Sequence, residues 1–219
     1  MSGDQHFTTA DGCRIAYRID GPVDRPVLML SNSIATNLHM WDRSVAALGR
    51  SFRLLRYDTR GHGGSDAPAG PYSMDRLGRD VVELLDFLDI DRAHFLGLSL
   101  GGFIGQWLGV FAPNRIDRLI LSNTAPYLAA ELHFDDQIHA VLAASDMDAI
   151  ADGFMRNWFP ATMLAAPNEI VDEFSNMVLT TSPRGLAGCF AALRDVDLRR
   201  VIALIAAPTL VGSVYGMNF

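Results

Sequence analysis

The chain has little cysteine, and its two cysteines lie far apart. Cys13 and Cys189 fall in no C-x-x-C motif and in no spacing with histidine that suits a metal ion. Isolated cysteines of this kind are expected to be reduced, buried thiols in a reducing compartment. No metal site is therefore predicted.

The chain also lacks a basic face. Among its 219 residues, 25 are Asp or Glu and 18 are Lys or Arg, for a net charge of −7 at pH 7. The longest basic cluster is the pair Arg199 and Arg200. Because nucleic-acid binding depends on clustered positive charge, no nucleic-acid partner is expected.

A long apolar run is missing as well. No stretch approaches the roughly 20 apolar residues of a membrane span. The N-terminal sequence MSGDQHFTTADG is too polar and acidic for a secretory signal. No membrane partner is expected, and the predicted location is cytoplasmic. With 49% apolar and 20% charged residues, the composition is typical of one globular domain with a single core.

Strand and helix patterns alternate over the first part of the chain. Apolar or alternating runs predict strands at 7–9, 13–19, 26–31, 53–58, 93–99 and 118–123. Helical spacing predicts a short helix near 40–48, a helix with Ser73 as its N-cap, and a helix at 103–111. This order predicts an α/β fold with a mostly parallel sheet and right-handed crossovers.

The pattern changes after about residue 125. Residues 129–200 carry helical periodicity with almost no strand pattern, and residues 207–214 predict one more strand. We interpret residues 125–200 as a helical cap inserted in a core made of residues 1–124 and 201–219.

The stretch FLGLSLGG at 95–102 holds the candidate nucleophile. It places Ser99 between Gly97 and Gly101 in a G-x-S-x-G pattern, after a predicted strand and before a predicted helix. That context is typical of a nucleophile elbow, a strained turn in which side chains at the two glycine positions would clash with the backbone. The alternative is a glycine-rich turn that only tightens a junction of strand and helix.

Two backbone amides are candidates for an oxyanion hole. One belongs to Leu100, directly after the candidate serine, and the other to Ile34, in a polar loop that follows an earlier strand. The loop at 58–64 is rich in Asp, Arg and His. There we expect Arg60 and His62 to fix the loop by hydrogen bonds rather than to do chemistry.

Four stretches resemble the α/β-hydrolase fold family and, within it, the 3-oxoadipate enol-lactonases. They are LSNSIATNLHMWD (30–42), RYDTRGHGGSD (56–66), FLGLSLGG (95–102) and SPRGLAGCFAALRDVDL (182–198). The first and last are the more specific. The resemblance implies an α/β-hydrolase fold with a helical cap, no cofactor, and hydrolysis of the enol-lactone of 3-oxoadipate in aromatic catabolism. It further implies that Ser99 attacks the lactone carbonyl while the Ile34 and Leu100 amides hold the oxyanion.

The other two members of a catalytic triad are not found where this fold would place them. In chain order the acid and then the histidine follow the serine, but no Asp or Glu follows Asp197 and no His follows His139. We therefore expect a C-terminally truncated fold, with the last strand and helix absent, and impaired hydrolysis. We also expect residues 209–214 to form an exposed apolar edge that favours pairing with other chains.

Two alternatives to the enol-lactone reading stay open. One is a non-catalytic member of the fold that binds a small carboxylate, and the other is a different carboxylic-ester hydrolase or a perhydrolase. The expected partner is in each case a small molecule, for the enzymes a lactone or ester. Arg156 and Arg194 are candidate cations for a substrate carboxylate, and Trp158 is a candidate pocket wall. Solvated surface positions for the arginines and core packing for the tryptophan are the simpler explanations.

Overall fold

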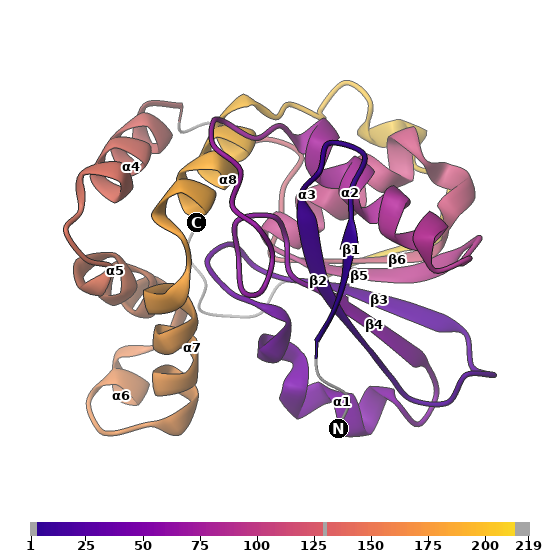
Figure 1. Ribbon diagram of the computed structural model, residues 1–219, viewed down its shortest axis with the longest axis horizontal. Helices are drawn as coiled ribbons and strands as arrows, with labels where there is room; N and C mark the ends of the chain where they lie inside the picture. The colour runs from indigo at the N-terminus through magenta and orange to yellow at the C-terminus, as the bar shows by residue number, and fades with distance from the viewer. Residues whose placement is uncertain (1–3, 129–130, 213–219) are drawn as a thin grey trace.

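The computed structural model of the protein describes residues 4–128 and 131–212. They contain one seven-stranded sheet in the order β1-β2-β4-β3-β5-β6-β7 (Figure 1). The strands are β1 (Gln5–Thr8), β2 (Arg14–Asp20), β3 (Val27–Ser31), β4 (Arg53–Tyr57), β5 (Ala93–Leu98), β6 (Ile116–Ser122) and β7 (Thr209–Gly212). The pairs β1–β2 and β2–β4 are antiparallel, and the other four pairs are parallel. The predicted mostly parallel sheet is confirmed.

Different helices cover the two faces of the sheet. The helices are α1 (Asp42–Leu48), α2 (Met74–Phe87), α3 (Leu100–Phe111), α4 (Glu131–Ala143), α5 (Asp148–Trp158), α6 (Ala161–Leu164), α7 (Glu169–Thr180) and α8 (Pro183–Asp195), with 3-10 turns at Leu38–Trp41, Pro113–Arg115 and Ile202–Leu204. Side chains of β3 alternate between the faces. Met29 joins the core that contains α2 and α3, whereas Leu28 and Leu30 pack against α1. Burial on both faces explains the continuous apolar run of this strand.

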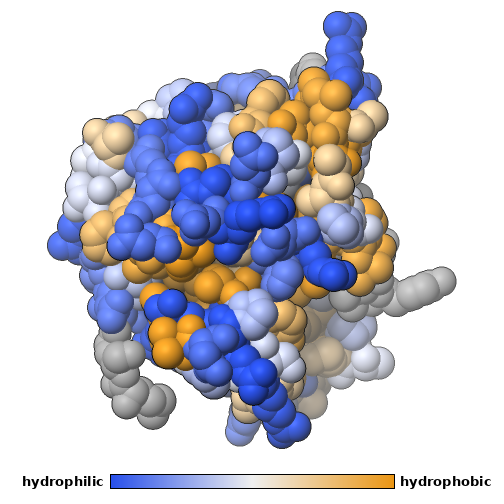
Figure 2. Space-filling model, turned by 90° about the vertical axis from the view of Figure 1, so that its right-hand side faces the viewer, coloured by the Kyte–Doolittle hydropathy of each residue, from blue (hydrophilic) through white to orange (hydrophobic). Residues whose placement is uncertain are grey.

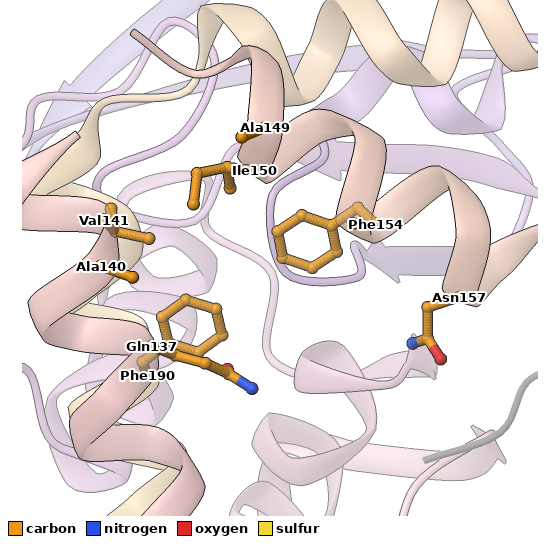
Figure 3. Close-up of a pocket in the computed structure, with 9 residues that line it drawn as sticks. Gln137, Ala140, Val141, Ala149, Ile150, Phe154, Asn157 and Phe190 are labelled. Carbon is orange, nitrogen blue, oxygen red and sulfur yellow. The ribbon is translucent and has the colours of Figure 1, made fainter. Parts of the chain in front are cut away.

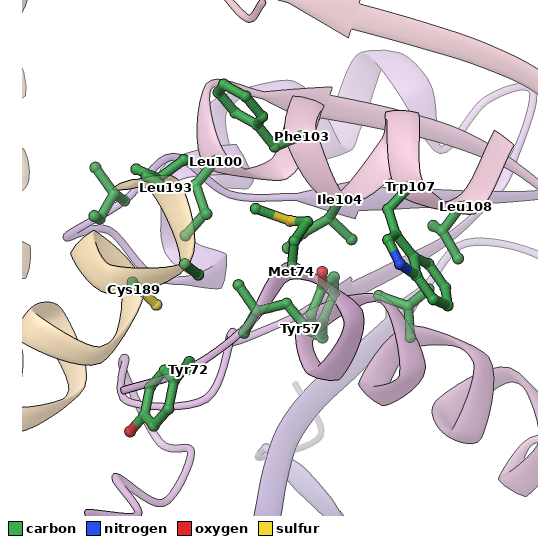
Figure 4. Close-up of a cluster of buried hydrophobic side chains, with 14 of the residues drawn as sticks. Tyr57, Tyr72, Met74, Leu100, Phe103, Ile104, Trp107, Leu108, Cys189 and Leu193 are labelled. Carbon is green, nitrogen blue, oxygen red and sulfur yellow. The ribbon is translucent and has the colours of Figure 1, made fainter. Parts of the chain in front are cut away.

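Helix α3 lies inside the core and is buried on all sides from Leu100 to Gly109. Figure 4 shows its residues Leu100, Phe103, Ile104, Trp107 and Leu108 in one cluster with side chains from β4, the loop before α2, α2 itself and α8. The Trp107 indole lies against Gly78 of α2, where an added Cβ would come within 2.0 Å of the ring. This close approach of α2 and α3 fixes the position of α3, whose N-cap is Ser99.

Helices α4 to α7 lie beside one end of the sheet, at the left in Figure 1, and α8 returns toward α2 and α3. The two ends of the segment that contains these helices are in contact with each other. There the Leu198 N–H donates to the Pro126 carbonyl at 2.9 Å, and Tyr127 forms a β-bridge with Asp197. The proposed division into a core and a cap at 125–200 falls beside this junction and stays a prediction.

Strand β7 is the last strand of the described sheet. It matches the strand predicted at 207–214, although positions 213–214, like the rest of 213–219, lie outside the described residues. Its side chains are exposed, as expected for an apolar edge. The expected absence of a further strand and helix stays a prediction.

The surface is mixed in polarity. Figure 2 shows the side of the molecule that lies to the right in Figure 1, where hydrophilic side chains surround smaller apolar patches. Within residues 4–128 and 131–212, no helix combines the length and the apolar character needed to cross a membrane.

Candidate active site

Ser99 occupies the junction of β5 and α3 in a strained backbone conformation. Its φ of 53° and ψ of −114° lie in a region that side chains with a Cβ seldom adopt. Two sets of hydrogen bonds hold it there. The Ser99 N–H donates to the Ser122 carbonyl at 2.9 Å, and the Ser99 carbonyl accepts from the amides of Gly102 and Phe103. The turn therefore has the local geometry expected of a nucleophile elbow.

The glycines on either side of Ser99 are required by contact. A Cβ on Gly97 would lie 2.1 Å from the Gly101 carbonyl oxygen, and a Cβ on Gly101 would lie 2.3 Å from the Ser31 carbonyl oxygen. A Cβ on Gly102 would lie 2.6 Å from the Thr124 side chain. The steric reason predicted for Gly97 and Gly101 is thus confirmed.

The loop at 31–36 is fastened next to the start of α3. The Asn32 side chain donates to the Tyr57 carbonyl at 2.8 Å and accepts from the Trp41 indole at 2.7 Å. The Asn32 carbonyl accepts the Gly101 amide at 3.0 Å, which ties the loop to the first turn of α3. This arrangement brings the loop beside the serine, as the oxyanion prediction requires.

The two predicted oxyanion donors have no hydrogen-bond acceptor within the described residues of the protein. Within the described residues, neither the Ile34 amide nor the Leu100 amide donates a hydrogen bond to the protein. The next residue, Ala35, adopts a left-handed φ of 59°, and its amide donates to Nε2 of His62 at 2.9 Å. The neighbouring amide is thus used to hold the loop, while the Ile34 and Leu100 amides stay available for a ligand.

The loop after β4, residues 58–64, holds the oxyanion loop in place through hydrogen bonds. The Asp58 carboxylate accepts the amides of Leu38 and Gly64 at 2.6 and 2.8 Å. Arg60 forms buried hydrogen bonds to Asp80 at 2.6 Å. With His62 accepting from the oxyanion loop, the predicted structural roles of Arg60 and His62 are confirmed.

Burial shifts the pKa of two groups in the loop after β4, His62 and Asp58. Burial lowers the pKa of His62 to about 4, so that its imidazole is neutral at pH 7. Burial raises the pKa of Asp58 to about 6, although the amides of Gly64 and Leu38 act in the opposite direction. His62 is therefore a neutral hydrogen-bond acceptor here, which agrees with its contact to the Ala35 amide.

The other five histidines serve elsewhere. His6 contacts the Gly64 carbonyl, His39 pairs with Asp42, and the ring of His94 in β5 meets Phe52. His133 and His139 lie exposed on α4. Within the described residues no histidine forms a hydrogen bond to the Ser99 hydroxyl.

A small pocket lies between the oxyanion loop and the helices α5 and α7. Its volume is about 120 Å³, and its walls are Ser33, Thr36, Met40, Leu98, Trp158, Phe159 and Phe174. We call it the elbow pocket, because Leu98 immediately precedes Ser99. It brings Trp158 to the candidate site, where the ring also packs against Phe174. The sequence did not indicate Phe174, since nothing in its helical pattern tells which neighbour it meets.

A family comparison identifies the fold. Residues 26–185 match the model of a family described as alpha/beta hydrolase fold. The chain belongs to the alpha/beta hydrolase fold family. By family resemblance it is a hydrolase.

Several relatives cover nearly the whole of this alpha/beta hydrolase. It is 37% identical to 3-oxoadipate enol-lactonase 2 of Acinetobacter baylyi over 93% of this chain and 76% of the relative. A hydrolase structure from Pseudomonas aeruginosa is 54% identical with a TM-score of 0.94, over 95% of this chain and 78% of that one. The enol-lactonase structure from Burkholderia xenovorans is 37% identical with a TM-score of 0.91, over 94% and 80% of the two chains. The resemblance to enol-lactonases is confirmed.

The two candidate substrate cations of this alpha/beta hydrolase are engaged in ion pairs with neighbouring carboxylates. Arg156 is exposed and comes within 3.9 Å of Asp152 on its own helix. Arg194 pairs with Asp135 and Asp195. Neither arginine lines the elbow pocket. Their role as substrate cations stays a prediction that would require these ion pairs to rearrange.

The sequence predicts no metal site, and this absence stays a prediction. Among the side chains described for residues 4–128 and 131–212, no three His, Cys, Asp or Glu groups gather as metal ligands would. Cys13 and Cys189 are both buried and unpaired by disulfide, and burial raises the pKa of the Cys13 thiol to about 11.

Proposed function

We propose that this chain is a serine hydrolase of carboxylic esters whose substrate is an enol-lactone such as that of 3-oxoadipate. The Ser99 hydroxyl attacks the lactone carbonyl, the ring C–O bond breaks, and the released enol oxygen takes a proton and becomes a ketone. Water then adds to the acyl-enzyme and frees the second carboxylate. Because the ring opens, both parts of the substrate leave as one oxo-acid. The names of the enol-lactonase relatives support this choice of substrate.

The observation that carries the proposal is the pair of free amides beside Ser99. Charge develops on the carbonyl oxygen during the attack, and a donor placed for that oxygen contributes about 10²–10³ to kcat. The Ile34 amide belongs to the loop after β3 and the Leu100 amide to the first turn of α3, and neither has an acceptor in the described protein. Leu100 is also the first residue of α3, where the helix dipole favours negative charge.

The elbow pocket supports a small substrate. Trp158, Phe159 and Phe174 supply apolar surface, while Ser33 and Thr36 supply polar edges. We propose Trp158 as one wall of the substrate site. Its partly buried ring is held by Phe154 and Phe174.

A fluorophosphonate probe tests the nucleophile. We expect this probe to label the chain, Ser99→Ala to abolish labelling, and Ser145→Ala, at an exposed serine between α4 and α5, to leave it unchanged. Labelling of Ser99→Ala at the rate of the unchanged chain would refute the role of Ser99. Ultraviolet absorbance then follows hydrolysis of 3-oxoadipate enol-lactone and of p-nitrophenyl acetate, which separates an enol-lactonase from a general esterase.

The labelling rate also tests the predicted impairment. If the chain lacks an activating base, as the sequence predicts, labelling is slow and hydrolysis falls to the residual level of about 10³–10⁴ over water that the oxyanion hole and substrate binding together supply. Rapid labelling and turnover would contradict the impairment and leave the nucleophile assignment intact.

A further inference from the structure

A second and larger cavity lies among the helices α4, α5 and α8. Its volume is about 430 Å³, and it is lined by Gln137, Ala140, Val141, Ala149, Ile150, Gly153, Phe154, Asn157 and Phe190 (Figure 3). We call it the cap cavity. Most of its walls are apolar, and Figure 3 shows the rings of Phe154 and Phe190 side by side within it. Their planes differ by 1° and their centroids lie 6.4 Å apart.

Two aromatic rings stand between the cap cavity and the elbow pocket. Phe154 and Trp158 lie four residues apart on α5, and therefore on the same side of that helix. Their ring centroids are 4.8 Å apart. Phe154 lines the cap cavity and Trp158 lines the elbow pocket. Among the described residues none lines both, and the contact between these two rings connects the wall of one space to the wall of the other.

Neighbouring rings hold the boundary in place. Trp158 meets Phe174 edge-on at 6.2 Å, and Phe154 is flanked by Phe190, which is 6% exposed. A wall packed on both sides resists displacement by a ligand. The elbow pocket, at about 120 Å³, is smaller than the roughly 300–1,000 Å³ of drug-sized ligand sites, whereas the cap cavity falls within that range.

We propose that the Phe154–Trp158 pair sets the upper length of the acids and esters that this chain accepts. This inference rests on the proposed function, in that the substrate occupies the elbow pocket. The wall confines ligands to a few carbon atoms beyond the carboxyl group. Removing the Phe154 ring takes away the packing on one side of Trp158. The Trp158 ring then turns into the vacated space and joins the elbow pocket to the cap cavity, whose apolar walls receive a longer straight chain.

Binding of saturated straight-chain carboxylates, from acetate to decanoate, tests the wall without any need for catalysis. Isothermal titration calorimetry gives Kd for the unchanged chain and for Phe154→Ala. We expect the unchanged chain to show no gain in affinity beyond butanoate. In Phe154→Ala, each added methylene up to octanoate strengthens binding by as much as about fourfold, the value for full burial of a CH₂ group. A gain of at least tenfold from butanoate to octanoate is the expected result.

Met40→Ala is the matched control. Met40 lines the elbow pocket but belongs neither to the Phe154–Trp158 pair nor to the rings packed on it, and it does not line the cap cavity. Its removal widens the elbow pocket without opening the wall, so the dependence on chain length stays flat. Equal gains in both variants, or a gain already present in the unchanged chain, would overturn the proposal.

Two further variants keep the test decisive. Phe154→Val retains a branched side chain and is expected to give a smaller gain in affinity with chain length. It tests the wall if Phe154→Ala does not fold. Adding Ala140→Phe to Phe154→Ala refills the cap cavity and is expected to cancel the gain. A length effect in binding, together with no Ser99 labelling in any variant, would count against the proposed function and not against the wall.

Discussion

Gly97 has no room for even one methyl group. Its added Cβ would lie 2.1 Å from the carbonyl oxygen of Gly101, which is backbone and cannot rotate away. We therefore expect Gly97→Ala to lower the free energy of unfolding by about 1–3 kcal/mol, the usual cost of overpacking. Urea denaturation followed by circular dichroism measures this change.

Gly153→Ala is the control for that substitution. Gly153 lies inside α5, has no left-handed φ, and an added Cβ there meets nothing within 4 Å. Alanine is favoured over glycine in a helix interior by about 1 kcal/mol. The same experiment should thus show opposite signs at positions 97 and 153, and a loss of stability in both variants would refute the steric argument.

His62 makes part of the stability depend on pH. Its pKa is lowered by burial from 6.5 to about 4 in the folded chain, so the unfolded chain binds a proton first as the pH falls. The stability due to neutral His62 is complete above pH 6.5 and is lost as the pH falls toward 4. Between pH 8 and pH 5 the expected loss is about 2 kcal/mol.

Asp58 acts in the opposite direction, so the effect of His62 has to be measured against a variant. Burial raises the pKa of Asp58 to about 6, and the folded chain therefore takes up this proton before the unfolded chain does. His62→Gln removes the titrating imidazole and keeps Asp58. Urea denaturation at pH 8 and pH 5 should show the stability advantage of His62 over Gln shrinking by about 2 kcal/mol. An advantage that does not change with pH would contradict a buried neutral imidazole.

At the scale of elements, Ser73 determines where α2 begins. Its hydroxyl accepts the Arg76 amide at 3.1 Å, as the sequence predicted for an N-cap. Replacing a capping hydroxyl by a methyl group costs about 1 kcal/mol. We expect Ser73→Ala to lower the thermal unfolding midpoint and Ser73→Asn, whose side chain also caps, to restore most of it. Equal losses in both variants would show that the lost stability does not come from the capping hydrogen bond.

The order of elements was predictable, but the contacts between distant elements were not. Apolar runs, helical spacing and the glycines around Ser99 are local patterns, and they predicted the parallel strands, α2, α3 and the strained turn. The neighbours of Trp158 depend on how α5 packs against α7, which no local pattern reveals. Likewise Arg194 pairs with Asp135, 59 residues away, and no local pattern indicates this ion pair.

For the whole molecule, the exposed edge strand β7 is the feature that we expect to govern self-association. Leu210 and Val211 are 64% and 69% exposed. Successive residues of a strand point to opposite faces, so within the described residues both faces of the sheet are exposed at this edge. Within the described residues β7 pairs only with β6, and its other side carries unpaired backbone groups. An apolar, unpaired edge of this kind favours pairing with a second chain.

Val211→Lys tests whether this edge drives self-association of the 219-residue chain. A lysine on an edge strand opposes edge-to-edge pairing through its charge. Light scattering coupled to size-exclusion chromatography should show the unchanged chain associating as its concentration rises. Val211→Lys should remain monomeric to at least about fivefold higher concentration. Leu142→Lys adds the same charge at an apolar side chain that is 55% exposed on α4, where no strand edge exists, and should leave association unchanged. Equal protection by both lysines would assign the effect to net charge rather than to β7.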